Sequence, residues 1–287
     1  MEFKNLTENV KIPVLGLGTG GFGSVFDTLA LKNRKSVSII QEAIKLGVTH
    51  IDTAELYANG YCEKLVGEAI NEFKREDLFI TTKVSPDNLK YNDLINSAKN
   101  SLKRLQTKYI DLYLIHNYNP NIPLKETMEA MDFLVEQKLV RLIGVSNFTV
   151  EELKEAQKFT KNRITANQIE YNLFYRNKTT NGFLKNQNIE MESKIIPYCQ
   201  ENNIIIIAYR PLAKGELFKK EIPILDELCR KYNKTRAQIA LNWLISKDKV
   251  VTIPKSSNLE HIKENLGALG WRMEKEDLEK LDKIEFS

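Results

Sequence analysis

The sequence contains very little cysteine and histidine. Its three cysteines, Cys62, Cys199 and Cys229, are widely spaced, and no two of them form a C-x-x-C pair. Disulfide frameworks and zinc sites take their sulfur ligands from close pairs of that kind, and only three histidines are present to complement them. We therefore expect neither a disulfide framework nor a bound metal, and we expect a protein of the reducing cytoplasm.

Long apolar runs and a strong net charge are missing as well. The longest aliphatic run, residues 204–208, has five residues, whereas about 20 are needed to cross a bilayer. Residues 1–13 are mostly polar and do not form the apolar segment of a secretory signal. Lysine and arginine number 42 against 38 acidic residues, and the excess of +4 is too small to indicate nucleic-acid binding. We therefore expect neither a membrane nor a nucleic acid as a partner.

The chain does contain enough apolar side chain for a large core. Hydrophobic residues make up 42% of its 287 residues, and this length suits one large α/β barrel. Two smaller domains would also fit the length, but no linker rich in proline, glycine or serine divides the chain. We therefore predict a single domain over residues 1–287.

Eight short segments have the composition of buried β-strands. They are apolar without strict alternation, as is typical of strands covered on both faces of a parallel sheet. The predicted strands are residues 15–18, 48–52, 79–84, 110–116, 139–146, 165–171, 204–209 and 250–254. Two further extended segments, 2–5 and 10–14, precede them and are joined by a polar turn.

Amphipathic helical patterns separate these strands. The residues expected to face inward include Leu94, Ile95, Ala98, Leu102 and Leu105 in one helix and Met128, Met131, Phe133 and Leu134 in the next. Thr149 and Thr235 are candidate N-caps of two later helices. Eight strands with crossover helices in one uninterrupted domain favour a closed (β/α)8 barrel, and an open doubly wound sheet is the alternative.

A glycine-rich segment follows the start of the first strand. Gly16, Gly18 and Gly21 match the G-x-G-x-x-G pattern of dinucleotide-binding folds. In that fold a helix begins among the glycines, but no convincing helical pattern starts here before about Ser36. An acidic residue should also end the next strand ~20 residues further on, whereas Asp52 comes later. We predict instead that these glycines let the end of the strand approach a ligand closely.

Polar side chains close three consecutive strands. Asp52 ends the second strand, Lys83 the third and His116 the fourth, and Tyr57 follows Asp52 by five residues. Each alone has an ordinary structural explanation, such as a helix cap or a surface lysine. In an α/β barrel, however, active sites lie at the C-terminal ends of the strands, so we expect these four side chains to converge there.

These four side chains suit proton transfer to a carbonyl oxygen. A tyrosine in water has a pKa of about 10, which is too high for efficient proton transfer near neutrality. A neighbouring lysine is expected to lower that pKa by stabilising the phenolate, and a carboxylate would hold the lysine in place. A histidine can hydrogen-bond the carbonyl oxygen as negative charge develops on it.

Five motifs identify a resemblance to a known family. HIDTAELY, ITTK, YIDLYLIH, GVSNF and IPKS occur in an order and spacing that resemble the aldo-keto reductase superfamily over almost the whole chain. The resemblance implies a (β/α)8 TIM barrel with an N-terminal β-hairpin closing its bottom and extra C-terminal helices. It also implies that Tyr57 is the general acid/base and that Asp52, Lys83 and His116 support it. Relatives that reduce activated C=C bonds replace the histidine with glutamate, so His116 favours carbonyl reduction.

The same resemblance implies a binding site for NADPH. The residues that match cofactor contacts of the family are Gly18, Thr19, Asp52, Ser146, Asn147, Gln168, Tyr209, Leu212, Lys255, Ser256, Ser257, His261, Glu264 and Asn265. By resemblance, the first three border the nicotinamide ribose and the next three hydrogen-bond the carboxamide. Tyr209 would stack on the nicotinamide ring, and the last two would contact the adenine.

The segment after the last strand indicates which cofactor is preferred. Lys255, Ser256 and Ser257 precede a helix whose N-terminal amides favour anions, an arrangement that suits the 2′-phosphate of NADP. His261 stands where NADP-preferring relatives usually carry arginine, and histidine is largely neutral at pH 7 and lacks a bidentate fork. We therefore predict a preference for NADPH that is weaker than usual, with measurable use of NADH.

The sequence departs from the family pattern at three places where relatives form the substrate pocket. Asn117 follows His116 where many relatives have tryptophan, and Gly20 stands where an aromatic residue is common, with Phe22 as a partial replacement. The chain ends at residues 284–287, whereas longer relatives continue into a loop over the mouth of the barrel. We therefore expect an open, unselective pocket for small aldehydes or ketones, in a monomer or weak oligomer.

Two other functions are compatible with the sequence. Lys83 could form a Schiff base with a carbonyl substrate, as the strand-end lysine of a class I aldolase does, although Tyr57 would then have no role. Potassium-channel β subunits also look like aldo-keto reductases and hold NADPH mainly as a sensor. The intact set of four polar residues favours an enzyme over such a sensor.

Overall fold

The central feature of the computed structural model, which describes residues 1–23, 30–177 and 190–284, is an eight-stranded parallel sheet. Its strands lie side by side in the order of the sequence, β3 to β10. They are β3 (Leu17–Gly18), β4 (His50–Asp52), β5 (Phe79–Val84), β6 (Ile110–Ile115), β7 (Val140–Ser146), β8 (Ile164–Glu170), β9 (Ile205–Tyr209) and β10 (Val250–Thr252). Their bounds agree with the predicted segments to within two residues. Every residue of β5 and β6 is buried, as expected for strands covered on both faces.

The sheet closes on itself between its first and last strands. Leu15, just before β3, pairs in parallel with Thr252 of β10, and the Gly16 amide donates to the Thr252 carbonyl over 2.9 Å. The Gly18 amide donates to the Pro254 carbonyl over 3.1 Å. The predicted barrel is therefore confirmed, and the open doubly wound sheet is excluded.

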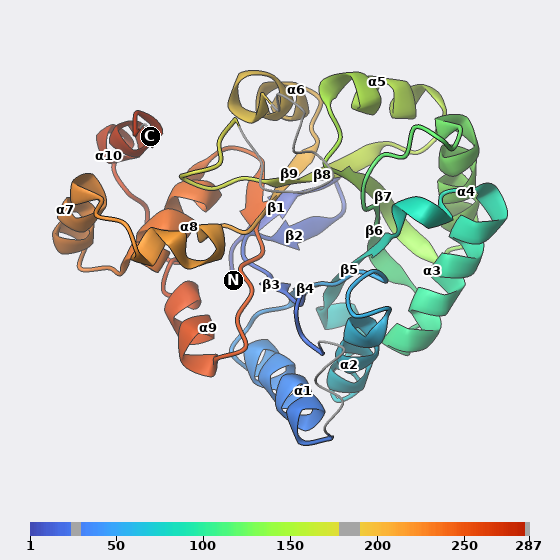
Figure 1. Ribbon diagram of the computed structural model, residues 1–287, viewed down its shortest axis with the longest axis horizontal. Coiled ribbons are helices and arrows are strands. Elements are labelled where there is room, and N and C mark those ends of the chain that lie inside the picture. The colour runs from blue at the N-terminus through green and yellow to red at the C-terminus, as the bar shows by residue number, and fades with distance from the viewer. Residues whose placement is uncertain (24–29, 178–189, 285–287) are drawn as a thin grey trace.

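Helices surround the barrel (Figure 1). They are α1 (Ala30–Lys45), α2 (Tyr61–Ile70), α3 (Tyr91–Leu105), α4 (Leu124–Glu136), α5 (Val150–Lys158), α6 (Ile196–Glu201), α7 (Pro223–Tyr232), α8 (Arg236–Ser246), α9 (Leu259–Leu266) and α10 (Lys275–Asp282). The last two follow β10 and are the predicted extra C-terminal helices. Helix α1 begins at Ala30, six residues before the expected start, so the prediction of that boundary was wrong.

The helix patterns in the sequence correspond to buried faces. All five residues predicted to face inward from α3 are buried. In α4 the two methionines and Leu134 are buried, whereas Phe133 is only partly buried. Thr149 and Thr235 each form a capping box, with the side chains accepting from the amides of Glu152 over 3.2 Å and Gln238 over 3.3 Å.

The N-terminal hairpin closes one end of the barrel. Strands β1 (Phe3–Asn5) and β2 (Lys11–Pro13) pair antiparallel, with Phe3 opposite Pro13. Leu6 and Ile12, at and beside the turn, are fully buried in a cluster with Phe79 and Ile205, which begin β5 and β9. The hairpin therefore covers the N-terminal ends of the strands, as predicted, and leaves the opposite end for the site.

Two glycines of the G-x-G-x-x-G match lie very close to neighbouring parts of the chain. A Cβ on Gly16 would lie 2.6 Å from Nδ1 of His50, and one on Gly18 would lie 2.9 Å from the Ile253 carbonyl oxygen. Gly18 and Gly21 also line the pocket described below, so the predicted close approach to a ligand stays a prediction. No helix begins among them, so the dinucleotide-binding fold of that motif is excluded.

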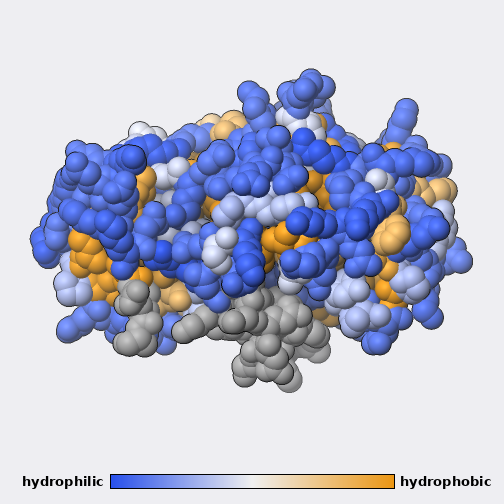
Figure 2. Space-filling view, turned by 90° about the horizontal axis from the view of Figure 1, so that it is seen from above, coloured by the Kyte–Doolittle hydropathy of each residue, from blue (hydrophilic) through white to orange (hydrophobic). Residues whose placement is uncertain are grey.

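The face of the molecule drawn in Figure 2 is largely hydrophilic, with small and separate hydrophobic areas. Among the residues that the structure describes, no helix combines the length and the apolar character that a membrane crossing demands. Residues 285–287, which include most of the chain end discussed above, lie outside the described residues.

Candidate active site

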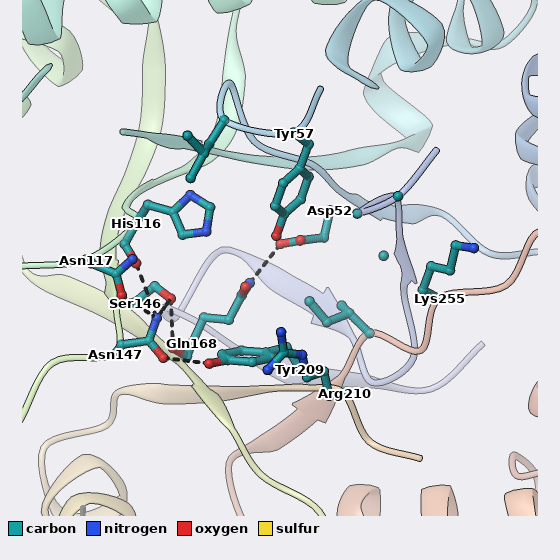
Figure 3. A pocket seen from close by; sticks show the side chains of 15 residues that line it. Asp52, Tyr57, His116, Asn117, Ser146, Asn147, Gln168, Tyr209, Arg210 and Lys255 are labelled. Carbon is teal, nitrogen blue, oxygen red and sulfur yellow. Dashed lines mark hydrogen bonds between the residues drawn. The ribbon is translucent and has the colours of Figure 1, made fainter. Parts of the chain in front are cut away.

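A pocket of about 400 Å³ opens at the C-terminal ends of the strands (Figure 3). Its lining residues are Gly18, Gly20, Gly21, Asp52, Leu56, Tyr57, His116, Asn117, Ser146, Asn147, Gln168, Tyr209, Arg210, Ile253 and Lys255. Three of the four residues proposed for catalysis are in this set. The fourth, Lys83, lies directly behind the pocket wall, since its amine bonds two of the lining residues.

Lys83 and Asp52 form a buried ion pair. Their side chains are 0% and 2% exposed, and Nζ lies 2.6 Å from Oδ1 of Asp52. Nζ also donates to the Thr53 carbonyl over 2.8 Å, and Oδ2 of Asp52 accepts from Nε2 of Gln168 over 2.8 Å. Burial alone would lower the pKa of Lys83, but the charges and hydrogen bonds of Asp52 and Tyr57 outweigh it and raise that pKa. The lysine is therefore a fixed cation beneath the pocket.

Tyr57 presents its hydroxyl to this cation. The Lys83 Nζ atom is 3.5 Å from the Tyr57 hydroxyl oxygen and 5.0 Å from the centre of its ring. Burial raises the pKa of Tyr57 above its ordinary value, and the opposing effect of Lys83 is smaller. The prediction of a lowered tyrosine pKa was therefore wrong: the ammonium acts in the expected direction, but removal from water is the larger effect.

His116 packs edge-on against Tyr57, with ring centres 5.6 Å apart. Burial, followed by the nearby charge of Lys83, lowers the pKa of His116 to about 3. The ring is consequently neutral at neutral pH, and its buried Nδ1 has no hydrogen-bond partner in the described part of the chain. A neutral imidazole can donate a single hydrogen bond into the pocket without adding a charge to it.

The residues matched to the nicotinamide contacts form one hydrogen-bonded group. Asn147, with φ of +61°, donates from Nδ2 to Ser146 Oγ over 2.9 Å, and its Oδ1 accepts from the Tyr209 hydroxyl over 3.0 Å. Ser146 in turn donates to the Gln168 carbonyl over 3.0 Å. These bonds fix the Tyr209 ring at one side of the pocket, as Figure 3 shows.

Two further cavities continue the pocket into a groove. The second, of about 430 Å³, shares Gly20, Arg210 and Lys255 with the first pocket. The third, of about 380 Å³, shares Leu212 and His261 with the second, and Lys255 lines all three. Because neighbouring cavities share lining residues, the three together form a groove that an extended molecule could occupy.

Most of the remaining predicted cofactor residues line this groove, and two lie outside its cavities. Leu212, Ser256, His261, Glu264 and Asn265 line its far cavity. Thr19 is fully buried and lines none of the three cavities, because its hydroxyl donates to the Asp52 carbonyl over 3.0 Å. Ser257 is exposed beside Lys255, whose Nζ donates to its hydroxyl over 3.4 Å.

Sequence reasoning missed five groove residues that follow β9: Arg210, Pro211, Lys214, Gly215 and Phe218. Arg210 lies where the first and second cavities meet, and its Nη1 is 3.2 Å from Oε1 of the buried Glu170. The strand-end rule that identified Asp52 applies equally to β9 and would have found Arg210 directly after it.

The structure argues against Schiff-base chemistry at Lys83. A nucleophilic amine must be neutral and must reach the substrate. The Lys83 side chain is completely buried, its pKa is raised, and its amine bonds Asp52, the Thr53 carbonyl and Tyr57. Lys83 is therefore unsuited to be the nucleophilic amine that an aldolase of this kind requires.

Comparison with known proteins agrees with this site. The family model described as "Aldo/keto reductase family" matches residues 14–285. Methylglyoxal reductase YeaE of Escherichia coli strain K12 is 33% identical over 279 residues, which cover 96% of this chain and 92% of that protein. Glyoxal reductase of Bacillus subtilis strain 168 is 34% identical over 281 residues, covering 97% and 91%. The chain therefore belongs to the aldo/keto reductase family.

Solved structures agree as well. The thermostable aldo-keto reductase Tm1743, crystallised with the inhibitor epalrestat, superposes with a TM-score of 0.87 at 40% identity, covering 98% of this chain and 99% of that one. The aldo/keto reductase from Klebsiella pneumoniae, crystallised with NADP and acetate, gives 0.82 at 33% identity and covers 96% and 92%. The predicted enzyme class, an oxidoreductase of the aldo-keto reductase type with a nicotinamide cofactor, is thereby confirmed.

Proposed function

We propose that this protein reduces small aldehydes or ketones to alcohols with NADPH, and that Tyr57 donates the proton. One observation carries the proposal: the Tyr57 hydroxyl, which lines the pocket, lies 3.5 Å from a lysine amine that is itself 2.6 Å from a buried carboxylate. A positive charge held that close stabilises the tyrosinate left after proton transfer.

The residues divide the reaction between them. NADPH, when bound, would supply a hydride to the carbonyl carbon. The neutral His116 donates a hydrogen bond to the carbonyl oxygen, and Tyr57 transfers its phenolic proton to that oxygen as the C–O double bond becomes single. Asp52 keeps Lys83 charged and in place. The Tyr57 hydroxyl is protonated at neutral pH and can therefore act as the acid in the reduction.

The groove fits the cofactor in its polarity and in its shape. Tyr209 offers an aromatic face beside amide and hydroxyl groups that could bond a carboxamide. Arg210, Lys214 and Lys255 line the middle cavity, where an anionic linker would pass, and Lys255 continues into the far cavity with His261. We propose that Lys255 contacts the 2′-phosphate and that His261 does so more weakly than an arginine would, so that NADH remains usable.

Asn117 narrows the substrate class. The Asn147 Nδ2 atom donates to the His116 carbonyl over 3.3 Å, and a carbonyl can only accept, so the orientation of that amide is fixed. The same nitrogen lies 2.9 Å from Oδ1 of Asn117, which accepts from it. This leaves the Asn117 Nδ2 donor for the pocket, where it could bond a second oxygen of the substrate. Together with the names of the methylglyoxal and glyoxal reductases above, this supports small 2-oxoaldehydes among the substrates.

We also retain two predictions that concern the chain as a whole. The eight strands belong to one barrel, which supports a single domain over residues 1–287. A monomer or weak oligomer remains our expectation.

The test follows NADPH consumption with methylglyoxal and with simple aldehydes, comparing wild type with Tyr57→Phe. We expect kcat to fall by about 10³-fold in the variant, because the proton donor is lost, while NADPH binding measured by fluorescence is retained. Unimpaired turnover in Tyr57→Phe would show that the proton comes from another group. Tight NADPH binding without turnover in wild type would favour the sensor alternative.

A further inference from the structure

The loop that carries Tyr57 has an unusual backbone. Ala58, Asn59 and Gly60 have φ of +48°, +54° and +81°, so three consecutive residues adopt the left-handed region. For the two that are not glycine this conformation is costly and persists only where the surroundings enforce it. Because Tyr57 directly precedes these residues, whatever enforces the loop also sets the position of its hydroxyl.

One side chain from another helix lies against this loop. A Cβ on Gly60 would lie 2.6 Å from Nε and 2.7 Å from Cδ of Arg104, so the arginine occupies the space beside the Gly60 backbone. Arg104 is the second-to-last residue of α3, and its Nη2 donates to Ser101 Oγ over 3.2 Å. Its side chain thus runs back along α3 toward the loop, as helix side chains generally do.

Two acidic residues hold the guanidinium there. Arg104 Nε donates to Oε2 of Glu63 over 2.6 Å, and Nη2 lies 3.8 Å from Oε2 of Glu55. The side chains of Glu63 and Glu55 are 0% and 10% exposed, whereas that of Arg104 is 29% exposed. Glu55 precedes Tyr57 in the loop and Glu63 follows it in α2, so the arginine bridges both sides of the tyrosine.

The same carboxylates are tied to the strand that carries Lys83. Glu63 Oε1 accepts from Thr82 Oγ1 over 2.5 Å, and Glu55 Oε1 accepts from the Ser85 amide over 2.6 Å. The Glu55 amide donates to the Lys83 carbonyl over 3.3 Å. The Tyr57 loop and β5 are therefore joined on both sides of Lys83 through two carboxylates that share one arginine.

We propose that Arg104 is a positioning residue for the reaction: it fixes the left-handed loop so that the Tyr57 hydroxyl faces Lys83 and the pocket. Arg104 lines none of the three cavities of the groove, so it acts through Tyr57 and not on substrate or cofactor. This inference rests on the proposed role of Tyr57.

A second arginine provides a matched control for loss of stability. Arg75 Nη2 lies 2.6 Å from Oδ2 of Asp111, whose side chain is 1% exposed, so it also neutralises a buried carboxylate. It bonds the carbonyls of Leu78 and Tyr109, next to the N-terminal ends of β5 and β6, at the opposite end of the barrel from Tyr57. Asp111 also has a second partner, Arg141 Nη1 at 2.8 Å from its Oδ1, so Arg75→Met removes one ion pair of a buried carboxylate without touching the Tyr57 loop.

The test is a double-mutant cycle on kcat. We expect Arg104→Met to lower kcat by about 30-fold, because small displacements of a catalytic group are costly, while the NADPH dissociation constant changes less than about twofold. The double variant should be studied in single-turnover measurements at high enzyme concentration. Adding Arg104→Met to Tyr57→Phe should lower the single-turnover rate by less than about twofold, since the positioned hydroxyl is already absent. Arg75→Met should lower the melting temperature while keeping kcat within about twofold of wild type.

The outcomes separate the two proposals. If Arg104→Met lowers kcat equally with and without Tyr57→Phe, or leaves kcat unchanged, Arg104 is a structural residue only and this inference is overturned. If Tyr57→Phe itself turns over normally, the proposed function fails as well. Should Arg104→Met not fold, Glu55→Gln keeps the bond to the Ser85 amide but removes the charge facing Arg104. We expect Glu55→Gln to lower kcat by about threefold when Tyr57 is present and to have little further effect in Tyr57→Phe. An unchanged kcat in Glu55→Gln would overturn the inference.

Discussion

The two ends of the groove are built differently. At the catalytic end, Asp52, Lys83, Ser146 and Gln168 are buried, and each is hydrogen-bonded to a neighbouring residue. At the far end, Lys255 is exposed, and among the residues that the structure describes its amine lies 3.4 Å from Ser257 Oγ and 5.3 Å from the centre of the Phe22 ring. His261 is exposed as well.

This difference has a physical consequence. Buried polar groups interact strongly in a medium of low polarity and depend on one another, so removing one leaves its partner uncompensated. Exposed cations interact weakly with their surroundings and can be exchanged without disturbing the fold. Substitutions at the catalytic end should therefore change chemistry and stability together, whereas those at the far end should change cofactor selection alone.

The largest effect is expected from Lys83→Met. It removes the cation beside Tyr57, so kcat should fall by about 10³-fold, and it leaves Asp52 buried without its partner, so the free energy of unfolding should fall by about 3 kcal/mol. Adding Asp52→Asn should restore much of the stability but none of the turnover, as measured by urea unfolding and NADPH consumption. Recovery of turnover in the double variant would contradict the assignment of Lys83.

Lys255→Ala should have a smaller and more selective effect. Loss of one charged contact to the 2′-phosphate should raise KM for NADPH by about 30-fold, which corresponds to about 2 kcal/mol. KM for NADH, which lacks that phosphate, and kcat at saturating NADPH should hardly change. Equal effects on the two cofactors would mean that Lys255 does not recognise the 2′-phosphate.

A prediction of similar size concerns His50, which lies fully buried beneath the catalytic end. Burial lowers its pKa to about 3 from 6.5, so between these values the unfolded chain binds a proton that the folded protein does not. Stability is therefore complete above pH 6.5 and decreases as the pH falls. His50 alone should account for a loss of about 2 kcal/mol in the free energy of unfolding between pH 7 and pH 5. In His50→Gln, the free energies of unfolding measured with urea at pH 7 and pH 5 should differ by about 2 kcal/mol less than in wild type. An unchanged difference would contradict this role of His50.

The smallest effect is expected from His261→Arg. An arginine could bond a phosphate bidentately and is always charged, so the ratio of kcat/KM for NADPH to that for NADH should rise by about fivefold. Stability should be unchanged because the side chain is exposed. A ratio that stays the same would place the 2′-phosphate away from residue 261.

Much of the fold and most of the site could be predicted because the signals are local. Short apolar segments and strand-end polar residues are visible in the sequence, and the barrel then brings Asp52, Tyr57 and His116 to one pocket. The sign of the Tyr57 pKa shift was predicted wrongly, because it depends on how much water the folded site excludes. The bridging role of Arg104 was not predicted either, since 41 residues separate it from Glu63.

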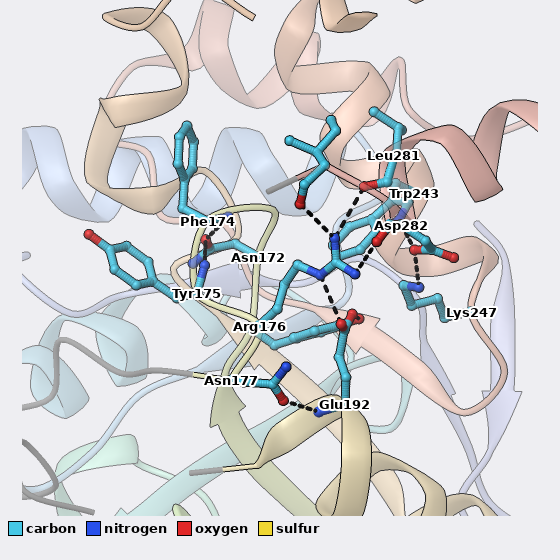
Figure 4. Close-up of polar contacts among 12 residues, drawn as sticks. Asn172, Phe174, Tyr175, Arg176, Asn177, Glu192, Trp243, Lys247, Leu281 and Asp282 are labelled. Carbon is cyan, nitrogen blue, oxygen red and sulfur yellow. Dashed lines mark hydrogen bonds and ion pairs between the residues drawn. The ribbon is translucent and has the colours of Figure 1, made fainter. Parts of the chain in front are cut away.

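Contacts between distant parts of the chain are a second feature that could not be predicted from the sequence. Arg176, in the loop after β8, donates to the carbonyls of Leu281 and Ile284 over 3.3 Å, and Trp243 donates to Asp282 over 2.7 Å (Figure 4). These bonds attach the end of α10 to the barrel. No periodicity or motif in the sequence indicates them, because each joins segments tens of residues apart.

The sequence by itself determined the barrel, the family and the polar side chains that we propose for the reaction, because hydrophobic periodicity and residue chemistry are properties of the chain. Only the tertiary structure decided which of these side chains are buried, charged or free to reach the pocket. Lys83 is the clearest case: its residue type allowed either a nucleophile or a fixed cation. Its complete burial and its 2.6 Å contact with Asp52 make it the cation, because an amine removed from water beside a carboxylate keeps its proton.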